Sequence, residues 1–229
     1  FRQSEAELLE VQRKEAAGCS LGQVGCCAGS TAVVMLLQRG SRCLHTAWVG
    51  DCRAVLCRAG KAVPLTTDHR ATDRREAARI IREGGELSFG RLGGHLAVAR
   101  AFGGLDYASL RKPAGLSAHP DVHSEPLQED DEFVILASDG LWDLLEPESA
   151  IRLTRDALQA FDDVHMASEQ LIEHACRLYP QDNLTAQVVR LAARPKPAEG
   201  LRRRRVSLMP PRKRFGVPTA SAESEDRSR

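Results

Sequence analysis

The sequence is poor in aromatic residues, has no long apolar run and shows no regular cysteine pattern. Aromatic residues make up 4% of the 229 residues, which leaves few side chains to stack on nucleic-acid bases. No apolar run approaches the roughly 18 residues that a membrane-spanning helix needs. The seven cysteines, two of them adjacent at Cys26 and Cys27, fit neither a disulfide framework nor a zinc site. We therefore expect no membrane partner, and reduced thiols in the cytoplasm, the nucleus or both.

The start of the sequence also lacks two common features. The first residue is Phe1 rather than Met, and no basic, apolar and small-residue order of a secretory signal follows it. The missing initiator favours a fragment of a longer gene product, and the alternative is a degenerate protein that a partner supports.

Charge is spread unevenly along the chain. The net charge is +1, but from residue 194 onward the eleven Arg and Lys residues exceed the four acidic residues by seven. Residues 1–193 therefore carry a net charge of about −6. An acidic body favours cation binding and argues against nucleic acid as a partner.

Hydrophobic periodicity predicts both helices and strands within residues 1–193. Apolar residues at helical spacing indicate helices at 4–17, 147–161 and 166–179. Asp73 and Glu76 have the spacing of a capping box, so a helix is expected there, ending at Gly84 and Gly85. The Gly-rich residues 88–104 are expected to form a loop with short extended pieces. Strands are predicted at 31–37, 43–49, 54–57 and 61–65, taken as one antiparallel meander, and at 122–127, 132–138 and 184–191.

Residues 194–229 are predicted to be a disordered basic tail, because they are rich in Arg, Pro and Ser. Ser207 lies two residues after the run Arg202 to Arg205, a pattern that a basophilic kinase would recognise. The same residues also fit a nuclear import signal, a weak polyanion-binding patch or a solvated tail without a dedicated role. We expect the chain to be a monomer.

Aspartates at the ends of predicted strands are the main chemical signal. Asp51, Asp139, Asp143 and Asp182 all follow or adjoin apolar segments. Each alone is more typical of a turn or a helix cap. Several such strand ends that converge would instead form an oxygen-rich cage, which suits Mg²⁺ or Mn²⁺.

Several motifs, in this order, resemble those of the type 2C family of metal-dependent protein phosphatases, also called the PPM family. The resemblance runs from about Gly29 to Leu191. Its motifs are GSTA at 29–32, WVGDCRAVL at 48–56, LTTDH at 65–69, Arg79-Ile80 with Gly84-Gly85, LAVARAFG at 96–103, FVILASDGLWD at 133–143 and DNLT at 182–185.

The resemblance implies that residues 1–193 are a partial α+β domain, a sandwich of two antiparallel β-sheets flanked by helices with its first part missing. It also implies two or more Mg²⁺ or Mn²⁺ ions in the cleft. Such a centre would hold a bridging hydroxide that hydrolyses phosphoserine and phosphothreonine in protein substrates. Asp139 and Asp182 would be ligands of the binuclear centre. Asp51, Asp143 and again Asp139 would form an additional, weaker metal site.

Part of the family pattern is absent. The sequence has no Asp-Gly-His-Gly-Gly motif, which in the family supplies a bridging Asp and a proton-donating His, and no upstream phosphate-binding Arg. We expect this chain alone to have little or no activity, with no catalytic residue of its own. Cys52 and Gly104 stand where the family usually has Ser and Asp, and Cys52 is either an oxidation-sensitive thiol or a packed residue. The alternative function is a catalytically dead pseudophosphatase that acts as a binding module.

Overall fold

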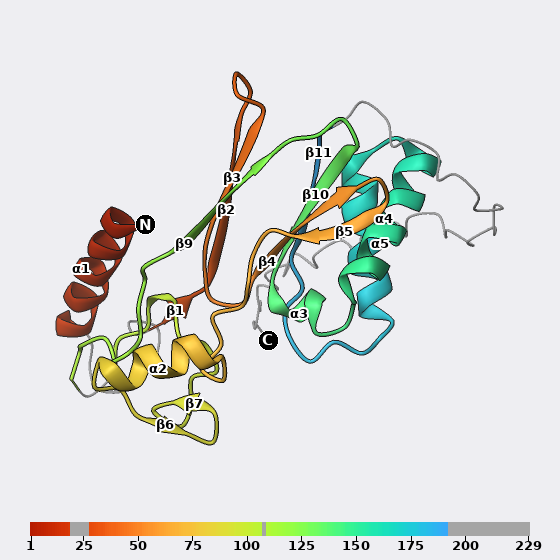
Figure 1. The fold of residues 1–229 in the computed structure, drawn as a ribbon. Coiled ribbons are helices and arrows are strands. Elements are labelled where there is room, and N and C mark those ends of the chain that lie inside the picture. The colour runs from red at the N-terminus through yellow and green to blue at the C-terminus, as the bar shows by residue number, and fades with distance from the viewer. Residues whose placement is uncertain (19–27, 107–108, 192–229) are drawn as a thin grey trace, which may run out of the picture.

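The computed structural model describes residues 1–18, 28–106 and 109–191 (Figure 1). The predicted basic tail at 194–229, with Ser207 and the arginine run, lies outside the described residues. Its disorder and its modification by a kinase therefore stay predictions. No helix in the described part of the chain is long and apolar enough to cross a membrane.

Two antiparallel sheets form the body of the molecule. The larger sheet has the strand order β11-β10-β4-β5, and the smaller has the order β2-β3-β9. The strands of the larger sheet are β4 (Arg53–Arg58), β5 (Lys61–Pro64), β10 (Asp131–Ala137) and β11 (Ala186–Arg190). Those of the smaller sheet are β2 (Ala32–Gln38), β3 (Cys43–Val49) and β9 (Asp121–Pro126).

The prediction of a single meander through the first four long strands is wrong. β2 pairs with β3 and β4 pairs with β5, but β3 and β4 belong to different sheets. The chain changes sheet at Gly50, whose φ of 91° lies in the left-handed region that favours glycine. Asp51 therefore lies where the two sheets join.

The two sheets pack through a shared apolar core. Leu44 of β3 contacts a cluster that includes Leu56 of β4 and Val134 of β10, all of them fully buried. Alternate residues on the same strands, such as Val55 and Phe133, point to the opposite face of the larger sheet. This alternation lets the central strands β4 and β10 be buried on both sides.

Helices cover that opposite face. α4 (Pro147–Phe161) and α5 (Val164–Cys176) lie side by side against the larger sheet, and the short α3 (Asp139–Trp142) follows β10 (Figure 1). Ile151 of α4 and Leu171 of α5 are fully buried in the same cluster as Phe133. α4 has the predicted bounds of 147–161, and α5 confirms the helix predicted at 166–179 but begins two residues earlier and ends three residues earlier. No helix in the described part of the chain covers the outer face of the smaller sheet, where Val34 is 54% exposed and Leu36 64% exposed.

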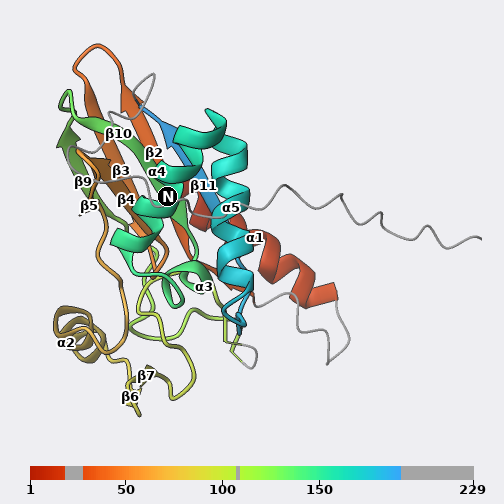
Figure 2. The ribbon, with the colours of Figure 1, turned by 90° about the vertical axis from the view of Figure 1, so that its right-hand side faces the viewer.

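A smaller lobe is built around α2 (Arg74–Arg82), which Figures 1 and 2 show at the end of the sheets opposite the β2-β3 hairpin. Its core contains Ile80, Leu92 and Ala99. Only half of the predicted capping box forms: the Asp73 carboxylate accepts from the amides of Arg75 and Glu76, while the Glu76 carboxylate turns to arginines instead. The Gly-rich segment contains the short strands β6 (Leu87–Ser88), β7 (Arg91–Leu92) and β8 (Phe102–Gly103).

The N-terminal helix α1 (Arg2–Gly18) lies against this lobe. The ring of Phe1 stacks on Phe102, with ring centroids 5.1 Å apart. Glu5 accepts from the amide of Gly103 and pairs with Lys112. The predicted helix at 4–17 is thus present, and it is attached through β8, which pairs with β1 (Gly29–Ser30).

Candidate functional site

Three strand ends bring the candidate metal-binding aspartates to one edge of the larger sheet. The antiparallel register pairs Arg53 of β4 with Ala137 of β10, and Ala137 with Ala186 of β11. Asp51 therefore comes just before the start of β4, and Asp139 comes just after the end of β10 at the same edge. Asp182 precedes β11 rather than ending a strand, but it reaches this edge because β11 runs antiparallel to β10.

Asp51 is the most buried of these carboxylates. The residue is 4% exposed, and it follows Gly50, whose amide donates to Nδ1 of His69 over 3.2 Å. Burial raises the pKa of Asp51, and the negative charge of Asp139 raises it further, while Arg70 acts in the opposite direction. A buried carboxylate beside a second carboxylate favours a cation close by.

Arg70 is the side chain that supplies positive charge at this place. Its Nη2 lies 3.5 Å from Oδ2 of Asp51 and 3.4 Å from Oδ1 of Asp143, and its Nε lies 3.1 Å from Oδ2 of Asp68. Asp68 also accepts two hydrogen bonds from Arg53, at 2.7 and 2.9 Å. Two arginines and three aspartates thus form one connected network.

Asp139 and Asp143 lie at the two ends of α3. Asp139 is its first residue, and its carboxylate accepts from the amide of Gly140 at 2.9 Å. The amide of Asp143, the C-cap residue, donates to the carbonyl of Asp139, which closes the single turn of the helix. The apolar run before Asp139 predicted a strand end here but not the helical turn, because four residues are too few to show a helical period.

The turn that carries Asp182 is joined to the turn that carries Asp139. A Cβ atom at Gly140 would lie 2.3 Å from the carbonyl oxygen of Asn183, so only glycine permits this approach. The hydroxyl of Ser138 accepts from the amide of Thr185 over 3.2 Å. The carboxylate of Asp182 itself accepts from its neighbour Asn183. The motifs around Asp139 and Asp182 are therefore in direct backbone contact.

The four aspartates supply the oxygen ligands that a hard divalent cation prefers, but their side chains are not arranged around one point as in a metal site. Carboxylate oxygens are the ligands that Mg²⁺ and Mn²⁺ prefer. Within residues 1–18, 28–106 and 109–191, however, no three His, Cys, Asp or Glu side chains converge closely enough to hold a metal ion. A guanidinium group lies between two of the four.

Cys52 is a packed residue. It is buried, its Sγ lies 3.6 Å from the carbonyl oxygen of Val49, and burial raises the pKa of its thiol to about 11. A thiol with a raised pKa is a poor nucleophile and resists oxidation, which favours packing over the oxidation-sensitive role. Gly104, the other departure from the family pattern, lies after β8, and its amide donates to the carbonyl of Ala28.

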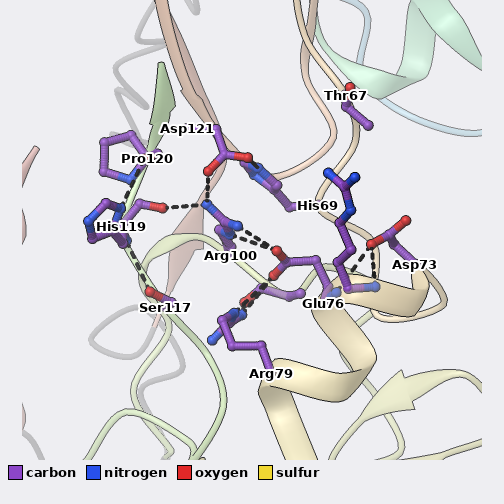
Figure 3. Close-up of polar contacts among 12 residues, drawn as sticks. Thr67, His69, Asp73, Glu76, Arg79, Arg100, Ser117, His119, Pro120 and Asp121 are labelled. Carbon is purple, nitrogen blue, oxygen red and sulfur yellow. Dashed lines mark hydrogen bonds and ion pairs between the residues drawn. The ribbon is translucent and has the colours of Figure 1, made fainter. Parts of the chain in front are cut away.

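A second polar cluster, which the sequence analysis did not identify, lies between α2 and β9 (Figure 3). The buried Glu76 accepts from Arg100 at 2.5 Å and from Arg79 at 2.8 Å, and Arg100 also pairs with Asp121 at 2.6 Å. Asp121 lies 3.2 Å from Nε2 of His69. Arg79, Arg100 and His69 all lie in motifs of the family resemblance. Those motifs were the sequence signal that could have identified this cluster.

This cluster borders an open cavity of about 770 Å³. Hydrogen bonds within the cluster determine whether its two carboxylates are protonated. Burial alone would raise the pKa of Glu76 and of Asp121, but hydrogen bonds outweigh it and hold both pKa values below their usual range. The donors are Arg100 and Arg79 for Glu76, and Arg100 and His69 for Asp121. Both carboxylates are therefore ionised and already paired, which makes the cluster a structural bridge between α2 and β9.

The comparisons with known proteins agree with this architecture. The family model for protein phosphatase 2C matches residues 7–184. A protein of Arabidopsis thaliana named "Probable protein phosphatase 2C 22" is 37% identical over 204 residues, which are 86% of this chain and 49% of that protein. "Probable protein phosphatase 2C 27" of Oryza sativa subsp. japonica is 40% identical over 71% of this chain and 46% of its own length. The chain thus spans about half the length of these curated relatives.

Solved structures show the same fold. A serine-threonine phosphatase 2C from Toxoplasma gondii superposes with a TM-score of 0.66 at 25% identity, over 82% of this chain and 64% of that one. A C. elegans sex determining protein superposes with a TM-score of 0.71 at 23% identity, over 83% of this chain and 45% of that one. Since the family model matches well over half of the residues and the sandwich recurs in these structures, the chain belongs to the protein phosphatase 2C family.

Proposed function

We propose that the protein is a metal-dependent phosphatase of phosphoserine and phosphothreonine in proteins, and that these residues supply one side of its metal centre. The observation that carries the proposal is the register of the larger sheet, which places Asp51, Asp139 and Asp182 at one edge. Membership of the protein phosphatase 2C family supports the reaction class.

The proposed metal ligands divide into two groups. Asp139 and Asp182 would hold the ions of a binuclear Mg²⁺ or Mn²⁺ centre, and Asp51 and Asp143 would join Asp139 at an additional site. Bound ions of this kind supply an activated water and offset the charge on phosphoryl oxygens. The protein groups keep the carboxylates in place: the His69 bond fixes the backbone before Asp51, and the packing of Gly140 on Asn183 joins the other two turns.

We further propose that the 229-residue chain has little phosphatase activity by itself. The sequence contains no Asp-Gly-His-Gly-Gly motif, so a bridging carboxylate and a proton-donating histidine are absent from it. A binding module without catalysis is the second candidate function. Two observations favour it: the missing motif, and the arginine that lies between Asp51 and Asp143.

Calorimetric titration of the chain with Mn²⁺ tests the metal assignment. We expect Asp139→Asn to weaken binding about tenfold or more, because even outer groups of a metal site change affinity by roughly 10–100-fold. A matched control is Glu129→Gln, which removes one exposed carboxylate away from the sheet edge. Asp156 of α4 is a poorer control, because it is half-buried and burial raises its pKa. Equal effects of Asp139→Asn and Glu129→Gln would contradict the assignment.

Release of phosphate from a phosphothreonine peptide, at saturating Mn²⁺, tests the second part. Metal binding without phosphate release would support the proposal that this chain lacks part of its catalytic machinery. Release that Asp139→Asn abolishes would instead show that the residues present are sufficient.

A further inference from the structure

Arg70 lies between two aspartates that the proposed function assigns to one metal site. Its Nη2 is 3.5 Å from Asp51 and 3.4 Å from Asp143, so a single nitrogen lies between the two carboxylates. Both distances are longer than the roughly 2.7–2.9 Å of a strong charge-assisted hydrogen bond. The guanidinium is therefore shared between the aspartates rather than bound tightly to either.

Charge compensation explains why a cation lies there. Asp51 is buried, and its segment lies at the same edge of the larger sheet as Asp139. A buried carboxylate without a partner is costly, so the fold needs positive charge at this point. Arg53 is close too, but it makes two hydrogen bonds to Asp68, so within the described residues Arg70 is the cation that pairs with Asp51.

The end of the Arg70 side chain is also able to move away from Asp51 and Asp143. Its side chain is 36% exposed, the Asp143 side chain is 62% exposed, and the aliphatic part of an arginine is long and flexible. The bond from Nε to Asp68 anchors the side chain outside the Asp51 and Asp143 pair, at 3.1 Å. The terminal nitrogen could therefore move toward solvent while this anchor remains.

We propose that Arg70 is a resident substitute for a divalent cation at the Asp51 and Asp143 pair, and that Mg²⁺ or Mn²⁺ must displace it to bind there. This inference rests on the proposed function, because it assumes a metal site that includes Asp51 and Asp143. It gives Arg70 two effects. The guanidinium stabilises the metal-free chain, and it weakens metal binding at this site, since only molecules with Arg70 displaced can bind the ion.

The opposite role for Arg70 would be to hold Asp51 and Asp143 at the spacing that a metal requires. The two roles predict opposite results when the charge is removed. A competitor that is removed leaves a tighter metal site, whereas a positioning residue that is removed leaves a weaker one.

The experiment is a Mn²⁺ titration of the 229-residue chain, followed by calorimetry, with the variants Arg70→Gln and Arg70→Lys. We expect Arg70→Gln to tighten one class of Mn²⁺ site about tenfold and to lower the thermal midpoint of the metal-free chain, with Mn²⁺ reversing that loss. Arg70→Lys keeps the competing charge and should stay within about threefold of the unmodified chain. Arg82→Gln removes one positive charge at the exposed end of α2 and is the matched control.

Asp143→Asn locates the effect. If Arg70 competes at Asp143, the gain from Arg70→Gln should disappear when Asp143→Asn is also present. A gain that is the same in both backgrounds, or in Arg82→Gln, would overturn the inference. So would weaker Mn²⁺ binding by Arg70→Gln, which would identify a positioning role.

A measurement on the unmodified chain covers the case in which Arg70→Gln does not fold. The ¹⁵Nη signals of Arg70, assigned by their absence in Arg70→Lys, should shift as Mg²⁺ saturates the site and releases the terminal nitrogen. A signal that does not respond, while Mg²⁺ still binds and Asp139→Asn weakens that binding, would overturn the inference and leave the proposed function standing. No binding of Mg²⁺ or Mn²⁺ by any variant would overturn both.

Discussion

The backbone amide of Gly50 donates a hydrogen bond to Nδ1 of His69, across 3.2 Å. Because Nδ1 accepts, Nε2 must carry the ring hydrogen, and it donates to Asp121 over 3.2 Å. The ring also stacks on Trp48, with ring planes only 5° apart. Burial lowers the pKa of His69, as expected for a neutral ring held in this way. His69 thus links the residue before Asp51 to the cluster around Arg100.

His69→Ala is expected to destabilise the chain by about 2–3 kcal/mol, because it removes two hydrogen bonds and a buried ring and leaves the Gly50 amide unpaired. The free energy of unfolding in urea measures this. His95→Ala is the control, since His95 is exposed and its ring hydrogen-bonds to the nearby carbonyl of Gly93. Similar losses in both variants would show that the His69 bonds contribute little.

Gly50→Ala tests the backbone at the point where the chain changes sheet. Alanine at a φ of 91° is strained, and its Cβ would lie 2.2 Å from Cγ2 of Thr31. We expect a loss of about 1–3 kcal/mol from the backbone strain, with the clash adding to it. Gly40→Ala is the matched control, because a Cβ at Gly40 would meet no atom within 4 Å. A thermal midpoint of Gly50→Ala equal to that of Gly40→Ala would refute the argument.

Ile151→Ala tests the packing of the helical layer on the larger sheet. Ile151 is fully buried in the cluster between α4 and that sheet, so truncation should cost about 2–5 kcal/mol. Ile81→Ala makes the same change on α2, where Ile81 is 64% exposed, and should cost about 0.5 kcal/mol or less. Urea denaturation of both variants gives the comparison, and a difference under 1 kcal/mol would contradict the assigned core.

The pH dependence of stability tests the ionised state of Glu76. Its pKa in the folded chain lies below the ordinary value of 4.5, so the unfolded chain binds protons more readily. The stabilisation is therefore fully present above about pH 4.5 and is lost as the pH falls through the lower folded value. Glu76→Gln should lower stability at pH 7 by about 2 kcal/mol or more, and should flatten the loss below pH 4.5.

The measurement for Glu76 is the free energy of unfolding in urea at a series of pH values between 7 and 3.5. Glu129→Gln is the control, because Glu129 is exposed. If Glu76→Gln and the unmodified chain lose stability equally steeply in acid, the ion pairs with Arg79 and Arg100 do not act as described.

Much of the fold could be predicted because its signals are local. β3 (Cys43–Val49) and α4 (Pro147–Phe161) match the predicted bounds, since apolar alternation and a proline at the helix start lie within single segments. The division of the first four long strands between two sheets could not be predicted in that way. It depends on which distant strand each one pairs with, and β4 pairs with β10 far along the chain.

The candidate site was predicted only in part, for the same reason. The motifs identified Asp51, Asp139, Asp143 and Asp182, and the structure brings their segments to one edge of a sheet. The position of Arg70 was not predicted, because nothing in its own segment shows that its guanidinium reaches Asp143. The half-formed capping box at Glu76 has a similar cause: Arg100, distant in sequence, competes for the carboxylate.

The pairing of β4 with β10 also sets an order of events during synthesis. Asp51 emerges from the ribosome long before Asp139 and Asp182, and strands that pair across a long loop form slowly. Until β10 has been made, the apolar residues of β4 lack their partner strand, and they are exposed to misassociation. The edge that carries the aspartates can therefore form only after β10 and β11 have both been translated, and β11 is the last strand among the described residues.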